Sequence, residues 1–254
     1  MGPRVQLIME TLLEQGISAT FFIVGEWAEQ HTALVRQLAA NGFEIGSHAF
    51  RHIPLNELNP TAAIAEINRS KILLEEISGT QVTGFRAPSW SASLGDHWLW
   101  DALSAAGFDY DSSLFPLRTT RFGSSANPLQ PFLLQKDLME IPPAAWSFGP
   151  LRLPVGGGFW FRLFPLPLTQ LLLRQIIKQS RSPVCYFHPW EFEKQQSPEE
   201  QEVFNRFIGN YRITGNWERF LKLVTEYDCV DMQTILAESG DMVLESRPQI
   251  TGQD

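Results

Sequence analysis

Residues 18–24 read SATFFIV, an apolar run between Gly16 and Gly25 that predicts a short buried strand. Helix and strand patterns alternate around this run through the first hundred residues. We expect helices over residues 5–14, 33–40, 60–78 and 95–106, and strands over residues 18–24, 43–47, 82–85 and 108–111. Strands separated by single helices form βαβ units. The sequence therefore predicts an α/β fold on a parallel sheet, open or closed into a barrel.

The second half of the chain has a different pattern. Residues 115–165 hold much of the proline together with recurring Phe and Trp, which indicates an irregular insertion with short strands. Beyond it we expect a helix over residues 166–179, a strand over 183–187, a helix over 217–224 and a last strand or turn over 229–235. We predict one domain over residues 1–236 and a loosely ordered tail over residues 237–254.

Composition excludes one class of partner. The formal net charge is -8 and Lys and Arg are scattered, whereas nucleic-acid binding needs clustered cations. No apolar run reaches the roughly 18 residues of a membrane span, so we expect no transmembrane segment. The first residues read as an amphipathic helix rather than a secretory signal, and we expect a cytoplasmic protein. Cys185 and Cys229 are too few for a cysteine zinc site and are expected to be free thiols.

Ionisable residues follow several of the predicted strands. His48 and His52 follow the second strand, and Arg86 follows the third. Asp111 ends the fourth strand, and His188 follows the strand predicted over residues 183–187. Because chemistry in βα folds lies at the carboxyl ends of the strands, these residues are the candidates for a functional site.

The histidines suggest metal binding and proton transfer. His48 and His52 are four residues apart, a spacing at which two imidazoles can reach one metal ion at about 2.0–2.1 Å. Ala49 excludes the H-E-x-x-H zinc helix, since that motif has glutamate at this place. His188 could serve as a general acid or base. For all three histidines a surface or hydrogen-bonded core position is the competing interpretation.

The other candidates also have a structural alternative. Arg86 could hold a carboxylate bidentately, or form a structural salt bridge. Asp111 could orient a histidine or pair with Arg86, or make an Asx-turn before Ser112. Three tryptophans could stack on sugar rings or lie in the core, and these are Trp90, Trp160 and Trp190.

Taken in order, five motifs resemble those of the NodB-type polysaccharide deacetylase family. They are residues 19–25 (ATFFIVG), 46–52 (GSHAFRH), 85–89 (FRAPS), 110–116 (YDSSLFP) and 187–191 (FHPWE). The chain further resembles the subgroup associated with exopolysaccharide and exosortase loci. That likeness rests on residues 140–143 (EIPP), 154–158 (PVGGG) and 161–165 (FRLFP).

This resemblance implies a distorted (β/α)7-type barrel that removes acetyl groups from an N-acetylated polysaccharide or oligosaccharide. It implies a divalent metal, usually zinc, bound by His48 and His52. It further implies that Arg86 braces the catalytic base, that Asp111 lies beside it, and that His188 protonates the leaving amine. The metal would polarise the acetamide carbonyl and activate the attacking water.

The chain departs from the family at one place. There, two acidic residues, a metal ligand and the general base, end a strand that precedes the one matching residues 18–24. No Asp occurs before Asp96, so we expect this first strand and both carboxylates to be absent. The chain is then either a shortened copy of an ordinary enzyme or a degenerate member. Unpaired backbone groups along residues 18–24 would be costly, which favours the shortened copy.

Three functions stay open. The first is N-deacetylation of a polysaccharide, and the second is carbohydrate binding by a pseudoenzyme or inactive truncated copy. The third is hydrolysis of a small ring amide, as in allantoinase-like relatives. Acetate release separates the first from the second, and a panel of substrates separates the first from the third.

Overall fold

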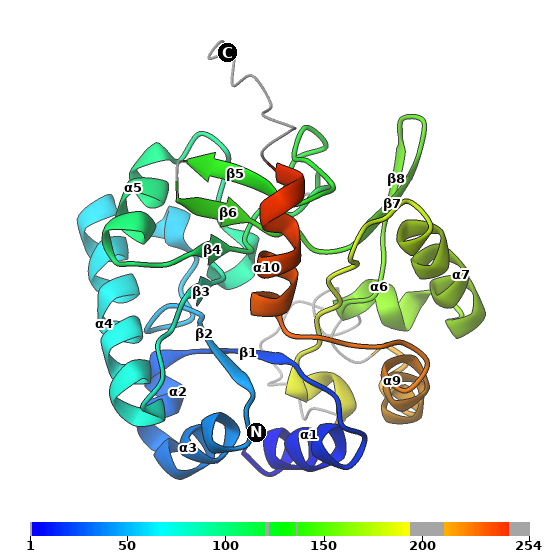
Figure 1. Cartoon of the computed structure of the whole chain (residues 1–254), viewed down its shortest axis with the longest axis horizontal. Coiled ribbons are helices and arrows are strands. Elements are labelled where there is room, and N and C mark those ends of the chain that lie inside the picture. Colours follow the sequence, from blue (N-terminus) through cyan, green and yellow to red (C-terminus); the bar gives the residue numbers. More distant parts are fainter. Residues whose placement is uncertain (1, 120–121, 136, 194–210, 244–254) are drawn as a thin grey trace. The chain divides into compact units, whose positions relative to one another are not determined.

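The computed structural model of the chain describes residues 2–119, 122–135, 137–193 and 211–243 (Figure 1). The chain divides into two compact units. We call residues 20–142 and 231–254 the sheet unit, and residues 1–19 and 143–230 the hairpin unit.

A six-stranded sheet forms the centre of the sheet unit, in the order β1-β2-β3-β4-β6-β5. The strands are β1 (Thr20–Ile23), β2 (Glu44–Ser47), β3 (Gly84–Phe85), β4 (Tyr110–Asp111), β5 (Phe132–Gln135) and β6 (Leu138–Glu140). In this sheet β1, β2, β3, β4 and β6 pair in parallel, each with the next in that order. Strand β5 lies at the edge and is antiparallel to β6. This confirms the α/β fold on a parallel sheet. Through the described strands the sheet stays open and does not close into a barrel.

Five helices belong to the described part of the sheet unit. They are α2 (Gly25–Gln30), α3 (Thr32–Ala40), α4 (Pro60–Ser78), α5 (His97–Ala105) and α10 (Met232–Val243). Figure 1 shows α3, α4 and α5 along one side of the sheet, whereas α10 begins at the amino end of β2, where its first residues bond to Glu44. No described helix is long and apolar enough to span a bilayer, and this includes α4, the longest of the five. The long helix α4 begins as its sequence predicts, because the Asn59 side chain accepts the backbone N–H of Ala62. It ends at Gly79, whose φ of 71° is the left-handed conformation that glycine adopts readily.

Helix α10 corrects the prediction for the end of the chain. We expected a strand or turn over residues 229–235 and a loose tail from 237, but a helix begins at Met232 and continues to Val243. Asp231 Oδ1 accepts the backbone N–H of Thr234 at 2.8 Å, which starts the helix. The Glu44 carboxylate of β2 accepts the N–H groups of Met232 and Gln233 at 3.1 Å each. Residues 244–254 lie outside the described part of the chain.

Glu44 also connects the first strands of the sheet. Its carboxylate accepts hydrogen bonds from the Tyr110 hydroxyl, at 2.7 Å, and from the Thr20 hydroxyl. Tyr110 reaches it across β3 because Gly84 has no side chain, and a Cβ there would lie 2.1 Å from the tyrosine ring. Burial raises the pKa of Glu44, and the hydrogen bonds of Thr20 and Tyr110 work against that rise.

The hairpin unit has a small antiparallel hairpin, β7 (Ala145–Phe148) and β8 (Leu151–Pro154). Its helices are α1 (Gly2–Glu14), α6 (Gly158–Leu163), α7 (Leu166–Ile177) and α9 (Asn216–Val224). A core of Phe161, Leu172, Leu173, Ile176 and Leu223 joins the last three of these helices. The strand expected over residues 183–187 is reduced to two isolated parallel bridges, at Val184 and Tyr186.

Candidate functional site

The strand registers of the sheet unit align one row of residues across the sheet. Ser47, Phe85, Asp111 and Glu140 are successive partners in β2, β3, β4 and β6. The residues that follow them therefore emerge at the same carboxyl edge, where parallel α/β sheets carry their sites. This register places His48 and Arg86, each of which follows its own strand, at neighbouring positions on this edge.

His48 has a defined tautomer. Its Nδ1 lies 2.6 Å from the backbone carbonyl oxygen of Arg86, and a carbonyl only accepts hydrogen bonds. The proton therefore lies on Nδ1 and the lone pair on Nε2, the nitrogen through which a histidine of this tautomer binds a metal ion. Ala49, the next residue, has a φ of 60°, a strained value for a residue with a side chain and one that is frequent at functional sites.

His52 lies beside His48 and faces it edge-on. The centroids of the two imidazole rings are 5.0 Å apart, and the ring planes meet at 67°. Two imidazoles on one tetrahedral zinc ion, with Zn–N bonds of about 2.0–2.1 Å, have ring centroids about 5 Å apart. The pair therefore fits two ligand positions of a zinc site. A catalytic zinc has three protein ligands, and no group of three candidate ligands occurs among the described residues.

Arg86 is held by β4 and by aromatic rings. Its Nε donates to the Ser112 carbonyl at 3.1 Å, and its Nη2 donates to the Ser112 hydroxyl at 2.8 Å. The guanidinium lies over the Phe22 ring at 4.2 Å and the Trp90 ring at 5.1 Å. Arg86 thus presents a fixed positive charge at the edge of the sheet, and this charge acts to lower the pKa of Asp111.

Asp111 has a partner that the sequence did not reveal. Glu140 lies opposite it in β6, and both side chains are fully buried. Ser113 donates to Asp111 through its N–H at 3.1 Å and its hydroxyl at 2.6 Å, while the Leu114 N–H donates to Glu140 at 2.9 Å. Glu140 stands in the EIPP motif, but only the strand pairing shows that it meets another carboxyl group.

The two buried carboxyl groups are costly to ionise together. Burial raises the pKa of both, and for Glu140 the negative charge of Asp111 raises it further, well above the ordinary value. Hydrogen bonds from Ser113 and the charge of Arg86 keep Asp111 the more acidic of the two. Asp111 and Glu140 thus form a buried pair of carboxyl groups, and the pKa of Glu140 is the more strongly raised of the two.

Replacing Glu140 with glutamine should flatten the dependence of stability on pH. Because the pKa of Glu140 is raised in the folded state, the unfolded chain binds fewer protons above its ordinary pKa of 4.5. The free energy of unfolding of the wild type therefore falls with rising pH, by up to about 1.4 kcal/mol per pH unit. Glutamine does not ionise, so this slope should shrink. Urea unfolding between about pH 5 and 8 measures it, and a slope equal to that of the wild type contradicts the pair. Glu57→Gln, at an exposed position, is the control.

His188 belongs to the hairpin unit, and there it contacts the carboxylate of Glu191. Its backbone N–H and its Nδ1 both contact Glu191 Oε1, at 3.0 Å and 2.7 Å. Nδ1 therefore carries a proton toward the carboxylate, and Nε2 is the nitrogen left for proton transfer. The Trp190 ring stacks on the imidazole at 5.3 Å, while 42% of the His188 side chain stays exposed.

A buried arginine holds Glu191. Arg162 Nε lies 3.3 Å from Glu191 Oε2, and both side chains are completely buried. Arg162 Nη1 also donates to the Tyr211 carbonyl at 2.9 Å, and Asn216 donates to the Glu191 carbonyl at 3.0 Å. Sequence reasoning did not assign a role to Arg162 or Glu191. The signals were their places in two motifs, Arg162 in FRLFP and Glu191 in FHPWE, and neither motif shows that the two side chains meet.

The three candidate tryptophans have different surroundings. Trp90 is only 8% exposed, and it packs against Phe115 at 5.4 Å as well as below Arg86. Trp160 and Trp190 are partly exposed. Trp90 thus supports Arg86 from the core, and sugar stacking stays a prediction for Trp160 and Trp190.

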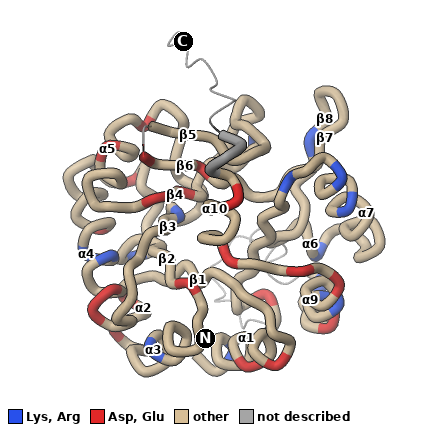
Figure 2. The backbone as a smooth tube through the Cα atoms, viewed as in Figure 1, with Lys and Arg blue, Asp and Glu red and all other residues tan. Residues whose placement is uncertain are grey.

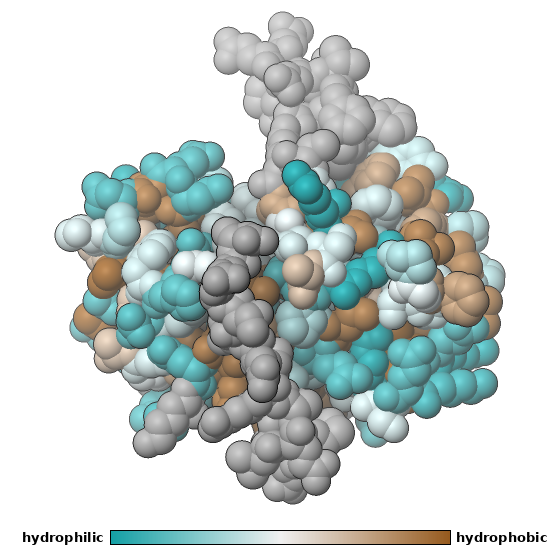
Figure 3. Space-filling model, turned by 90° about the horizontal axis from the view of Figure 1, so that it is seen from above, coloured by the Kyte–Doolittle hydropathy of each residue, from teal (hydrophilic) through white to brown (hydrophobic). Residues whose placement is uncertain are grey.

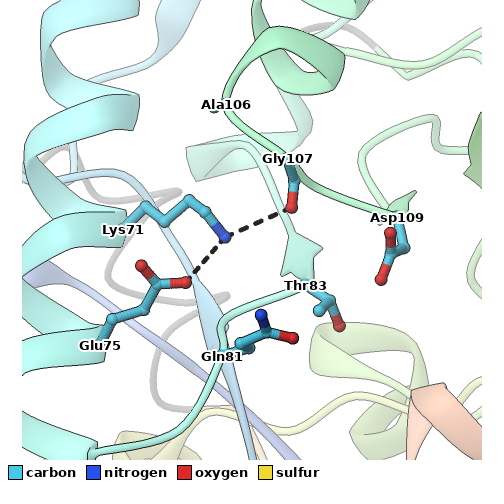
Figure 4. A pocket seen from close by; sticks show the side chains of 7 residues that line it. All are labelled: Lys71, Glu75, Gln81, Thr83, Ala106, Gly107 and Asp109. Carbon is cyan, nitrogen blue, oxygen red and sulfur yellow. Dashed lines mark hydrogen bonds and ion pairs between the residues drawn. The ribbon is translucent and has the colours of Figure 1, made fainter.

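A polar pocket of about 340 Å³ opens at the other edge of the sheet (Figure 4). Thr83 and Asp109 line it just before β3 and β4 begin, and Lys71 contacts Glu75 at 2.9 Å within it. Because it lies at the amino ends of these strands, it is separate from the edge that carries His48 and Arg86.

The fold and its carboxyl edge define an α/β protein that bears a histidine pair, a fixed arginine and a buried acid pair. Residues 2–110 match the family described as polysaccharide deacetylase, and residues 112–237 match a domain of unknown function, DUF3473.

Curated relatives agree with the first match. A chitooligosaccharide deacetylase of Azorhizobium caulinodans is 33% identical over 90 residues, which cover 34% of this chain and 43% of the relative. A peptidoglycan-N-acetylglucosamine deacetylase of Bacillus cereus is 30% identical over 90 residues, which cover 34% of this chain and 33% of the relative. The chain thus spans less than half the length of either relative. Together these matches support the polysaccharide deacetylase family for this chain.

Solved structures agree on the fold. A presumed polysaccharide deacetylase from Mycobacterium smegmatis superimposes with a TM-score of 0.63 at 20% identity, over 100% of this chain and 81% of that one. Puue allantoinase superimposes with a TM-score of 0.59 at 15% identity, over 94% and 72% of the two chains. At these identities the likeness establishes the fold alone.

Proposed function

We propose that this protein hydrolyses the acetamido groups of N-acetylhexosamine units in a polysaccharide with the help of Zn²⁺. The observation that carries the proposal is the His48–His52 pair. The pair lies within the segment that matches the deacetylase family, at the carboxyl edge of the sheet, with ring spacing suited to one metal ion. The EIPP, PVGGG and FRLFP motifs favour an exopolysaccharide as the polymer.

His48 and His52 would supply two of the metal ligands through nitrogen atoms. When bound, the metal would polarise the acetamide carbonyl and lower the pKa of a coordinated water. The Arg86 carbonyl keeps the His48 ring in the tautomer and orientation that a ligand needs. Arg86 and the acid pair of Asp111 and Glu140 fix the charge of the edge beside these ligands.

His188 would be the general acid of the reaction. Its Nδ1 hydrogen bond to Glu191 fixes the ring, and its partly exposed ring leaves Nε2 for the leaving group. A water oxygen bonds to the acetyl carbon, and the bond from this carbon to nitrogen then breaks as a protonated Nε2 gives its proton to the sugar nitrogen. The products are the free amine and acetate, and the protons that the water loses replace the one that His188 gave and pass to solvent. Stacked on this histidine, Trp190 is placed to contact the sugar ring.

Incubation of the protein and Zn²⁺ with an N-acetylglucosamine oligomer tests the proposal. The expected result is release of acetate together with free amines on the glycan. Glycan binding without acetate would replace the enzyme with a carbohydrate-binding pseudoenzyme. Hydrolysis of allantoin in place of the oligomer would favour a small ring amide as the substrate.

A further inference from the structure

A series of hydrogen bonds connects the proposed metal ligand His48 to the buried side chain of Asp111. His48 Nδ1 donates to the carbonyl oxygen of Arg86 at 2.6 Å. The N–H of the same peptide group belongs to Ala87, and it donates to Ser113 Oγ at 2.7 Å. The Ser113 hydroxyl in turn donates to Asp111 Oδ1 at 2.6 Å. We call this series the His48 network.

The three hydrogen bonds of the network all point toward Asp111. A backbone N–H can only donate, so the Ser113 oxygen accepts from Ala87 and its hydroxyl proton is left for Asp111. Both oxygens of Asp111 accept, since Oδ2 also takes the backbone N–H of Ser113 at 3.1 Å. In such a series each bond polarises the next, and a carboxylate at the end strengthens it. The carbonyl oxygen that His48 contacts thus becomes a stronger acceptor.

The middle of the network is sealed from water. Hydrophilic residues cover much of the surface drawn in Figure 3, but Ser113 and Asp111 are each 0% exposed and Ala87 is 1% exposed. Buried polar groups need hydrogen-bond partners, and the Ser113 hydroxyl supplies one to the Ala87 N–H. The Arg86–Ala87 peptide is therefore held from both sides, by His48 at its oxygen and by Ser113 at its nitrogen.

The neighbouring hydroxyl holds a different part of Arg86. Ser112 Oγ accepts from Arg86 Nη2 at 2.8 Å and donates to the Ile141 carbonyl at 2.6 Å. Ser112 therefore holds the arginine side chain, whereas Ser113 holds the peptide whose carbonyl contacts His48. Both serines are 0% exposed. They have the same size and the same burial but different partners, so variants of the two can separate these roles.

The backbone on both sides of Ser113 is bonded to the sheet. The Ser112 N–H donates to the Phe85 carbonyl at 2.9 Å, and the Leu114 N–H donates to Glu140 at 2.9 Å. Strands β4 and β6, each of which carries an acidic residue of the kind drawn red in Figure 2, lie side by side in the sheet. The position of the Ser113 hydroxyl is thus set by β3, β4 and β6.

We propose that Ser113 is a positioning residue for the metal ligand His48. It orients the Arg86–Ala87 peptide, and through this peptide it transmits the polarisation by Asp111 to the imidazole, which makes Nε2 a stronger ligand. Carboxylates that bond directly to a metal-binding histidine act in this way. The inference rests on the proposed function, which makes His48 a ligand. Ser113 lies in the segment that matches DUF3473, so that segment supplies part of the site of the deacetylase segment.

Ser113→Ala tests the proposal with two measurements. ¹⁵N NMR of the metal-free protein should show His48 as a mixture of tautomers in place of the Nδ1–H form, because the Ala87 N–H loses its acceptor and the peptide can turn. Competition with a chromogenic chelator should give a zinc affinity about 3–10-fold lower. This loss is smaller than the roughly 10–100-fold expected for a group that bonds directly to a ligand, since Ser113 acts through a peptide.

Ser112→Ala is the matched control. It removes an equally buried hydroxyl from the same turn and should leave His48 in its Nδ1–H form. Thermal unfolding by circular dichroism confirms that both variants fold. A Ser113→Ala protein with the tautomer and the zinc affinity of the wild type would overturn the proposal. Equal losses of zinc affinity in the two variants would also overturn it, because the effect would then belong to the turn as a whole.

A double-mutant cycle tests the path by which Asp111 acts. Asp111→Asn should lower zinc affinity when Ser113 is present, and much less in the Ser113→Ala background, where the network is already broken. Equal effects in both backgrounds would show that Asp111 acts through space, and would contradict the transmission through Ser113.

A measurement on the wild type needs no variant. NMR coupling across the hydrogen bond from His48 Nδ1 to the Arg86 carbonyl carbon should be detectable in the metal-free protein, and its absence would overturn the proposal. A wild type that shows this coupling, but binds no zinc and releases no acetate, would contradict the proposed function alone. The His48 tautomer in Ser113→Ala would still decide the role of Ser113.

Discussion

Replacing His48 with alanine should weaken zinc binding by more than about 100-fold. Loss of a group that only orients a metal ligand lowers metal affinity about 10–100-fold. His48 is itself a proposed ligand, with a tautomer that the Arg86 carbonyl fixes, so its loss should cost more. Acetate release from the N-acetylglucosamine oligomer should fall at least as far. Competition with a chromogenic chelator gives the affinity.

His97→Ala is the matched control for this result. His97 is an exposed histidine at the start of α5, in the same unit as His48. Its loss should leave zinc affinity and activity unchanged. Zinc binding of normal strength by His48→Ala would remove the histidine pair from the metal site and the main support from the proposed function.

Glu191→Ala should destabilise the protein by about 3–5 kcal/mol, because removal of one partner from a buried ion pair leaves the other charge without compensation. The charge left behind is that of Arg162, which is completely buried. The change also removes the carboxylate that accepts the hydrogen bond from Nδ1 of His188. Urea unfolding gives the free energy, and ¹⁵N NMR of the imidazole gives the tautomer of His188.

Two further variants separate the effect of Glu191 on protein stability from its effect on the position of the His188 ring. Glu193→Ala, two residues along, removes an exposed carboxylate that lies 3.7 Å from Arg4, and should change stability by about 0.5 kcal/mol or less. Glu191→Gln keeps a hydrogen-bond acceptor for His188 and should retain its Nδ1–H tautomer. A loss below about 1 kcal/mol for Glu191→Ala would show that Arg162 finds other compensation.

Local signals in the sequence predicted much of the fold. The alternation of apolar runs and helix patterns indicated the parallel sheet, and the Asn59, Pro60 and Gly79 signals indicated both ends of α4. Helix α2 was missed because its six residues are too few to show a helical period. The start of α10 was missed because Glu44, far away in the sequence, helps to fix it.

Some residues of the candidate site could be predicted from local sequence, and others could not. His48 and Arg86 could be predicted because each follows its own strand, and the register then sets them side by side. Glu140 could not be predicted as a site residue, because only the pairing of the two strands places it opposite Asp111. The role of Arg162 depends on Glu191, which is 29 residues away, and no local pattern links such a pair.

The hydrogen bonds from Met232 and Gln233 to Glu44 have a consequence for synthesis of the protein. The bonded residues are 188 and 189 positions apart, and in the sequence residues 143–230 of the hairpin unit separate the two segments of the sheet unit. At about 5–20 residues per second, a ribosome needs roughly 10–40 s to pass from β2 to α10. During that interval β2 has left the ribosome while the N-terminus of α10 has not yet been made. Completion of the sheet unit must therefore wait until Met232 and Gln233 have been made, and until then Glu44 lacks these two hydrogen-bond donors.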